Sequence, residues 1–232
     1  MIPADSYDDL LRSNIDLDVI KGYICAVRQY ERVGALQMMF AMNLTGTVDK
    51  MFLLRLGLRS VDSKADMHVR LGNCVIRKDG KRTVMELTPA GRQVAYHVKG
   101  LSEQIVSLVW TPPVSRTVDC EDGWGRDGLC PYRRIRQMER ACALQFLFVL
   151  YRMGGRAEMM TLVEGLDMDV SPSLTDVFLE LGLVTEGRVD GRKVFTLTDR
   201  GMTAAEHVDA IVRACDLVVW SHGQKGRRRS FF

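Results

Sequence analysis

Features that define several large classes of proteins are missing from this chain of 232 residues. It contains no run of about eighteen apolar residues, although a membrane-spanning helix needs about twenty. The start of the chain is acidic, where a secretory signal would be basic. We therefore expect a cytoplasmic protein that is not inserted in a membrane.

Cysteine pairs with short spacings are also missing. None of the six cysteines forms a CxxC pair. Cys25, Cys142 and Cys215 lie inside apolar helical stretches, and Cys74 lies next to a strand. Cys120, Cys130 and His222 lack the spacings of a structural zinc site. We expect reduced thiols in the core and no bound metal.

Catalytic motifs are absent as well. The sequence has no phosphate-binding glycine loop, no nucleophile elbow and no His and carboxylate set with metal spacing. Its scattered serines have no identifiable base. These absences predict a protein that is not an enzyme and needs no cofactor.

What the chain does contain is an internal duplication of a module of about eighty-five residues. One group of residues returns 108 positions later: Arg28, Gln29, Glu31, Arg32, Ala35, Leu36, Gln37 and Phe40. A second group returns 110 positions later: Leu87, Thr88, Gly91, Ala95, His97, Val98, Val109 and Trp110. The duplication predicts two similar domains, at 30–110 and 135–220. The remaining segments are an N-terminal helical extension (1–29), a linker (111–134) and a basic tail (221–232).

Each copy has the same order of expected elements. In the first copy, apolar periodicity predicts helices at 29–42, 47–56 and 61–71. Strands at 74–77 and 82–87 follow, joined through Asp79 and Gly80, a pair that favours a tight hairpin turn. Thr88 is the expected N-cap of a long helix that begins at Pro89 and extends to Trp110.

The second copy repeats this order, with helices near 137–152 and 158–165. Its third helix opens at Ser171 and Pro172, its hairpin turns at Asp190 and Gly191, and its last helix follows Thr198. The sequence therefore predicts a mainly α fold with small β-hairpins, of the α+β class. The apolar stripes of the two long helices either pack together or close separate cores.

The ends of both copies resemble those of winged-helix regulators of the MarR, PadR and ArsR kind. The resemblance rests on Leu183, Val184, Gly191, Arg192, Lys193, Leu197, Thr198 and Gly201, and on Val75, Lys81, Arg82, Leu87, Thr88 and Gly91. It implies two tandem winged-helix domains, with the third helix in the major groove of DNA and the hairpin, or wing, along the backbone. The implied DNA-binding residues are Ser63, Lys64, Met67, His68 and Arg70 on the third helix and Arg77, Lys78, Lys81 and Arg82 on the wing.

Charge is divided unequally between the copies. Residues 30–110 hold 12 Lys and Arg against 7 Asp and Glu, a net of +5, whereas residues 138–220 hold 8 against 13, a net of −5. Cations clustered on a projecting hairpin displace counterions from DNA, which favours the first copy as the main DNA reader.

The third helix of the second copy carries Asp176 and Glu180 and no cation, so a major-groove role is not expected there. Further cations that we expect to contact a phosphate backbone are on its hairpin and in the tail: Arg188, Arg192, Lys193, Lys225, Arg227, Arg228 and Arg229.

These observations predict a double-stranded DNA-binding protein, a transcriptional regulator, in which the duplicated module imitates a dimer. The chain is then a monomeric pseudo-dimer or a homodimer. One alternative is a tandem winged-helix scaffold that binds proteins through its acidic copy; another is a factor associated with RNA or a polymerase. In a further alternative, the acidic copy lies beside the basic copy and controls its availability.

Overall fold

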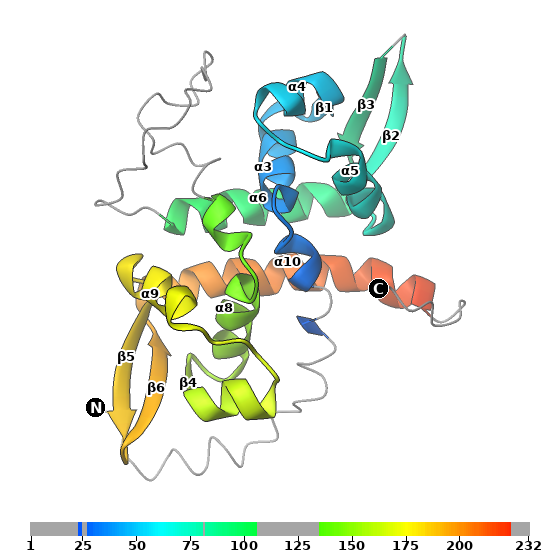
Figure 1. The fold of residues 1–232 in the computed structure, drawn as a ribbon. Coiled ribbons are helices and arrows are strands. Elements are labelled where there is room, and N and C mark those ends of the chain that lie inside the picture. The colour runs from blue at the N-terminus through cyan, green and yellow to red at the C-terminus, as the bar shows by residue number, and fades with distance from the viewer. Residues whose placement is uncertain (1–22, 25–26, 81, 106–134, 224–232) are drawn as a thin grey trace.

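The structure is a computed structural model that describes residues 23–24, 27–80, 82–105 and 135–223 (Figure 1). We call residues 27–105 the first half and residues 135–223 the second half. The first half contains, in order, α3 (Ala35–Thr45), β1 (Thr47–Asp49), α4 (Lys50–Arg55), α5 (Val61–Arg70), β2 (Cys74–Asp79), β3 (Arg82–Leu87) and α6 (Pro89–Gln104).

The second half repeats this order after a short 3-10 turn, η1 (Arg136–Met138). It contains α8 (Ala143–Arg152), β4 (Arg156–Glu158), a π-helical segment η2 (Thr161–Gly165), α9 (Pro172–Glu180), β5 (Val184–Val189), β6 (Arg192–Leu197) and α10 (Asp199–Gly223). The expected α+β class, mainly α with small β-hairpins, is confirmed. The predicted extension of the long first-half helix to Trp110 lies outside the described residues.

Each half has a three-stranded antiparallel sheet, whose third strand was not predicted from the sequence. The strand orders are β1-β3-β2 and β4-β6-β5. The helix predicted at 47–56 is therefore shorter, because Thr47, Val48 and Asp49 pair with β3. The Asp49 carboxylate then accepts a hydrogen bond from the Phe52 backbone N–H at 2.7 Å, which begins α4. The predicted hairpins are present, although Asp79 pairs with Arg82 and so belongs to strand β2.

The first predicted helix of each half is also interrupted. Gly34 and Cys142 have φ of 88° and 65°, so α3 and α8 begin only at the residues that follow them. Few side-chain types adopt this left-handed conformation without strain, and the same break occurs at equivalent positions of the repeat. At both breaks the two halves exchange contacts.

Two glutamates make that exchange. Glu139 of the second half accepts hydrogen bonds from the backbone N–H groups of Gly34 (2.6 Å) and Gln37 (2.8 Å). Glu31 of the first half accepts them from Cys142 (3.1 Å) and Gln145 (2.9 Å). Each carboxylate thus satisfies the free N–H groups at the start of the other half's helix.

These contacts follow the offset of the duplication, because Glu31, Gly34 and Gln37 lie 108 positions before Glu139, Cys142 and Gln145. Reciprocal contacts of this kind are the property of a two-fold interface. The halves are therefore related by an approximate two-fold axis within one chain.

The long helices α6 and α10 lie side by side along this interface (Figure 1). Helix α3 packs on α6 and α8 packs on α10, so the apolar stripes of the long helices meet each other as well as their own cores. Gly100 permits the close approach, since a Cβ at this position would overlap the His207 ring. No helix in the described ranges is both long and apolar enough to cross a membrane.

The repeated Leu-Thr motif before each long helix has a physical explanation. Thr88 Oγ1 donates to the Gly72 carbonyl at 2.5 Å and accepts from the Gly91 N–H at 2.9 Å. Thr198 makes the same pair of hydrogen bonds with Gly182 and Gly201. A threonine thus begins each helix and joins it to the residues before the hairpin, as predicted for Thr88.

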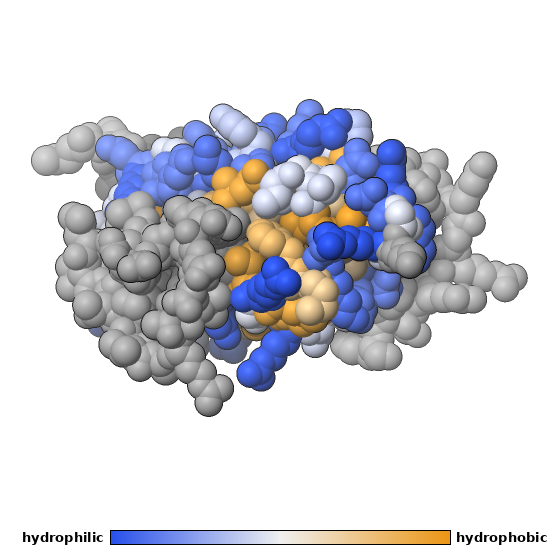
Figure 2. Space-filling model, turned by 90° about the horizontal axis from the view of Figure 1, so that it is seen from above, coloured by the Kyte–Doolittle hydropathy of each residue, from blue (hydrophilic) through white to orange (hydrophobic). Residues whose placement is uncertain are grey.

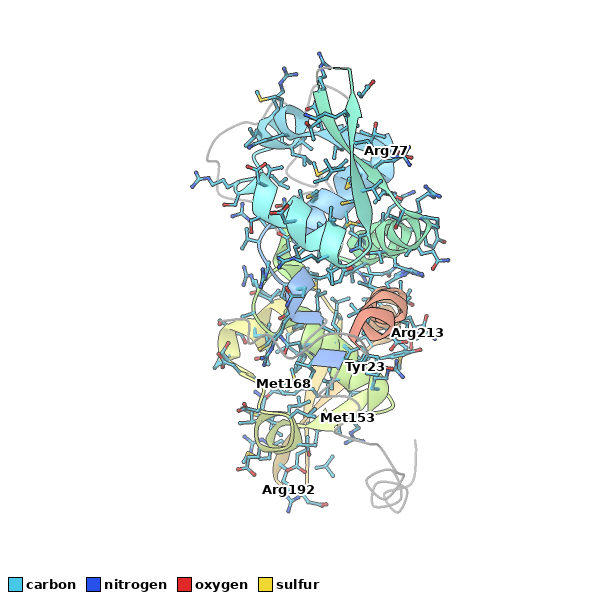
Figure 3. The ribbon with its side chains drawn as sticks, turned by 90° about the vertical axis from the view of Figure 1, so that its right-hand side faces the viewer. Tyr23, Arg77, Met153, Met168, Arg192 and Arg213 are labelled. Carbon is cyan, nitrogen blue, oxygen red and sulfur yellow. The ribbon has the colours of Figure 1, made fainter. Side chains whose placement is uncertain are left out.

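The β2–β3 and β5–β6 hairpins project from opposite ends of the molecule. Figure 1 shows their tips pointing away from each other, and Figure 3 places Arg77 near one end and Arg192 at the other. An approximate two-fold axis across the α6 and α10 pair produces this arrangement. Consequently, the basic hairpin does not face the acidic second half of its own chain.

Candidate nucleic-acid interface

Helix α5 holds the five third-helix residues that the resemblance implies, but it exposes only part of them. Met67 is 2% exposed and His68 is not exposed at all. Their side chains face the core of the first half, so they are not available to a DNA base. The prediction for these two residues was wrong, because helical spacing alone did not identify the buried face.

His68 has a structural role instead. Its Nε2 lies 3.1 Å from the Ala35 carbonyl oxygen, which can only accept, so Nε2 carries the proton. Its Nδ1 accepts a hydrogen bond from Asn73 Nδ2 at 3.1 Å. Burial lowers the pKa of His68 to about 4, and the ring is therefore neutral at pH 7. It joins α5 to the start of α3.

Lys64 is half-buried and points back toward the protein. Its aliphatic chain packs over Gly34, and its ammonium group donates to the Arg59 carbonyl oxygen. Burial lowers the pKa of Lys64, and the nearby Glu139 carboxylate opposes this shift. Lys64 is held beside the N-terminus of α3 and does not extend from the exposed face of α5.

The exposed face of α5 carries Ser63 and Arg70 together with two acidic residues, Asp62 and Asp66. Asp62 is neutralised by Lys50, whose Nζ lies 2.5 Å from its carboxylate. Arg70 Nε donates to the Asp66 carbonyl oxygen at 3.3 Å. Helix α5 thus contributes little positive charge, and of the five predicted residues only Ser63 and Arg70 are exposed.

The first hairpin is more basic. Arg77, Lys78 and Arg82 are exposed, whereas Lys81 lies outside the described residues. Arg77 Nε lies 3.2 Å from the Glu86 carboxylate, and Lys78 donates to Thr83 Oγ1 at 3.2 Å. Arg82 makes no ion pair with any described residue. These side chains are in water, where such pairs exchange readily with a phosphate.

A hollow of about 460 Å³ lies beside this hairpin, where β1 turns into α4. Three cations line it, namely Lys50, Arg55 and Arg82. Its other lining residues are Asp49, Met51, Phe52 and Thr83. Lys50 and Arg55 were not predicted as site residues, because the turn that brings them to β3 depends on strand β1, which the sequence did not predict.

The same positions in the second half are closed by ion pairs. Arg192 Nη1 lies 3.3 Å from the Glu158 carboxylate, and Lys193 Nζ lies 2.7 Å from Glu186. By the offsets of the duplication, Glu158 replaces Lys50 and Arg192 replaces Arg82. Arg188 remains exposed. Among the described residues, the second hairpin therefore leaves one cation outside an ion pair, whereas the first leaves two.

Apolar side chains are also exposed at the end of the first half. Met51 is 58% exposed and Ile76 is 48% exposed, and Leu54 and Val75 are exposed as well. Figure 2 shows apolar surface at the centre of this end, bordered by hydrophilic side chains. Thr185 and Glu186 replace Val75 and Ile76 in the second half. The exposed apolar pair on the hairpin, Val75 and Ile76, is thus a property of the first half alone.

The predicted tail residues Lys225, Arg227, Arg228 and Arg229 lie outside the described residues. Within the described ranges, no three His, Cys, Asp or Glu side chains are grouped so that they could hold a metal ion. Cys74 and Cys142 are buried free thiols, as expected.

No family model, curated protein or solved structure matches this chain. The resemblance to winged-helix regulators therefore rests on the repeated motifs themselves. Their local geometry, described above for Thr88 and Thr198, explains why the motifs recur but does not identify a family.

Proposed function

We propose that the protein binds double-stranded DNA through the end of the first half, as a regulator of transcription, and that each half is a winged-helix domain (30–110 and 135–220). The order helix, strand, helix, helix, hairpin supports the winged-helix assignment. The observation that carries the proposed function is the group of exposed cations on α4, the following loop and the first hairpin. We call this surface the basic end: Lys50, Arg55, Arg59, Arg77, Lys78 and Arg82.

In this proposal, phosphate contacts supply most of the affinity. Arg82 and Lys78 approach the backbone from the hairpin, and Lys50 and Arg55 approach it from α4. Ser63 and Arg70 are the side chains on α5 that can reach base edges, in place of the buried His68 and Met67. With two candidate readers, sequence preference is expected to be weak.

The opposite directions of the hairpins favour one DNA contact per chain. Homodimeric helix-turn-helix proteins place both readers on one side of the molecule, about 34 Å apart, and bind palindromic sites. This chain has the approximate two-fold axis but not that placement. We infer that its site is a single, non-palindromic segment.

Salt-dependent binding to a duplex of about 20 base pairs tests the proposal. We expect Lys78→Ala combined with Arg82→Ala to weaken binding to all sequences and to reduce the slope of log K against log[salt] by about one unit per lost phosphate contact. The matched control is Arg188→Ala with Arg192→Ala, the equivalent pair in the second hairpin, which should leave both quantities unchanged. Equal effects of the two double variants would contradict the proposal.

A protein-binding role is the second candidate, because Met51, Leu54, Val75 and Ile76 expose apolar area that a phosphate backbone does not require. An RNA duplex in the same titration examines the remaining alternative. Tighter binding to RNA than to DNA would replace DNA as the proposed partner.

A further inference from the structure

Charge is inverted between the two halves at three equivalent surface positions. Lys50, Arg59 and Arg70 of the first half correspond to Glu158, Asp167 and Glu180 of the second. The first three are exposed, as are Asp167 and Glu180. A duplication alone would produce two alike surfaces, whereas this chain has two complementary ones.

The acidic surface comprises residues of η2, the loop after it, and α9. We call it the acidic end: Glu164, Asp167, Asp169, Asp176 and Glu180, all exposed. It also exposes apolar side chains, since Met160 is 48% exposed and Val163 is 36% exposed. Met51 and Leu54 on α4 offer apolar area of the same kind at the basic end.

The two ends cannot neutralise each other within one chain. Helix α4 and the first hairpin lie at one extreme of the molecule, and η2 and the second hairpin lie at the other (Figure 1). The α6 and α10 pair separates them. This placement removes the intramolecular arrangement considered from the sequence and leaves a second molecule as the source of opposite charge.

We propose that the basic end of one chain binds the acidic end of a second copy of the same chain. Opposite charges favour this pairing over basic-to-basic or acidic-to-acidic contact, in which like charges repel. The exposed apolar residues at both ends supply area that becomes buried on association.

Such an interface is heterologous, because it joins two different surfaces. A bound pair leaves one basic and one acidic end free, so the contact repeats and generates a ring or a filament. The same basic end is the surface proposed above for DNA. DNA and a second copy therefore compete for it, and added duplex dissociates the assembly.

Sedimentation velocity of the full chain without nucleic acid tests the inference. At about 0.05 M salt, where charges interact over more than about 10 Å, we expect the mean sedimentation coefficient to rise between about 10 and 500 µM protein. At about 0.5 M salt it should remain that of a single chain. A wild-type protein that stays monomeric at low salt would overturn the inference.

Charge-reversed variants identify the two surfaces. Arg55→Glu with Arg59→Glu lowers the charge of the basic end by four and leaves the acidic end unchanged. Glu164→Lys with Glu180→Lys raises the charge of the acidic end by four and leaves the basic end unchanged. Each variant alone should associate at least about tenfold more weakly than wild type. An equimolar mixture should associate again, because the acidic end of the first variant and the basic end of the second are both unchanged.

The mixture also keeps the test independent of folding defects. All four replaced side chains are exposed, and recovery in the mixture requires both variants to be folded. If the mixture associates no more than its components, the assigned surfaces are wrong. DNA binding is measured separately. A wild-type chain that binds the duplex but does not associate with itself would overturn this inference and leave the proposed function standing.

Discussion

The imidazole rings of His97 and His207 face each other across the interface of the two halves, with their Nδ1 atoms 3.2 Å apart and their centroids 5.5 Å apart. The two residues are equivalents in the duplication, 110 positions apart. A residue that meets its own repeat partner lies on the two-fold axis. The axis therefore passes between these rings. The two histidines have the same structural role, because each contacts its equivalent in the other half.

A hydrogen bond between two Nδ1 atoms needs one ring to donate and the other to accept. At least one of the two rings is therefore neutral. Burial is the main cause that lowers the pKa of each ring. The charges of His207 and Arg213 lower the pKa of His97 further. The charges of Glu103 and Glu206 oppose the lowering of the pKa of His207. A lowered pKa in the folded state gives stability that is present above the ordinary value, about 6.5, and is lost as the pH falls.

We expect His207→Gln to raise the pKa of His97, because the neighbouring positive charge can no longer form. Titration of the imidazole resonances by NMR measures this. His68, which is buried elsewhere with a pKa of about 4, provides an internal control. An unchanged pKa of His97 in the variant would show that the rings do not interact.

The exchange between the halves predicts a dependence of stability on pH. Burial raises the pKa of Glu139 to about 7, although the N–H groups of Gly34 and Gln37 and the charge of Arg136 oppose this. A raised pKa in the folded state means that this contribution to stability is complete below about pH 4.5 and is lost as the pH rises through about 7.

We expect Glu139→Gln to destabilise the protein, since the amide cannot accept from both N–H groups. The loss in free energy of unfolding should be larger at pH 5 than at pH 8, by at most about 3 kcal/mol. Urea unfolding of wild type and variant at both values measures it. The comparison at equal pH cancels the titration of other groups, and a loss independent of pH would contradict the assigned shift.

Gly91 shows where the first long helix needs glycine. A Cβ there would overlap the Asn73 carbonyl oxygen, and Gly201 meets the Leu183 carbonyl in the same way. We expect Gly91→Ala to lower the free energy of unfolding by about 3 kcal/mol or more. Gly187→Ala is the control, because no atom lies within 4 Å of its Cβ position. Thermal or urea unfolding measures both variants. Similar losses in free energy of unfolding for Gly91→Ala and Gly187→Ala would show that the close packing at Gly91 is not important.

The hollow beside the first hairpin leads to a prediction about DNA affinity. Arg55→Ala should reduce the affinity for a duplex about threefold to tenfold and make its salt dependence shallower, as loss of one phosphate contact does. Val163→Ala changes the equivalent position in the second half, which is also exposed, and should have no effect. Fluorescence anisotropy at several salt concentrations compares them. An unchanged slope for Arg55→Ala would remove the hollow from the interface.

Local chemistry accounts for the parts of the fold that could be predicted. The caps at Thr88 and Thr198 involve residues close in sequence, and the hairpins follow from turn residues between alternating strands. The third helices also began where predicted. Strand β1 was missed because the strand with which it pairs, β3, lies more than thirty positions away.

By itself, the sequence determined that the chain is a duplication, that each copy is mainly helical with a hairpin, and that the copies carry opposite net charge. Those properties depend on residue identity and on neighbours within a few positions. Only the tertiary structure decided which candidates reach solvent: it buried His68 and Met67 and turned Lys64 inward. It also placed Glu31 at the start of α8 and Glu139 at the start of α3, and it directed the two hairpins to opposite ends. These outcomes depend on packing between segments about a hundred residues apart.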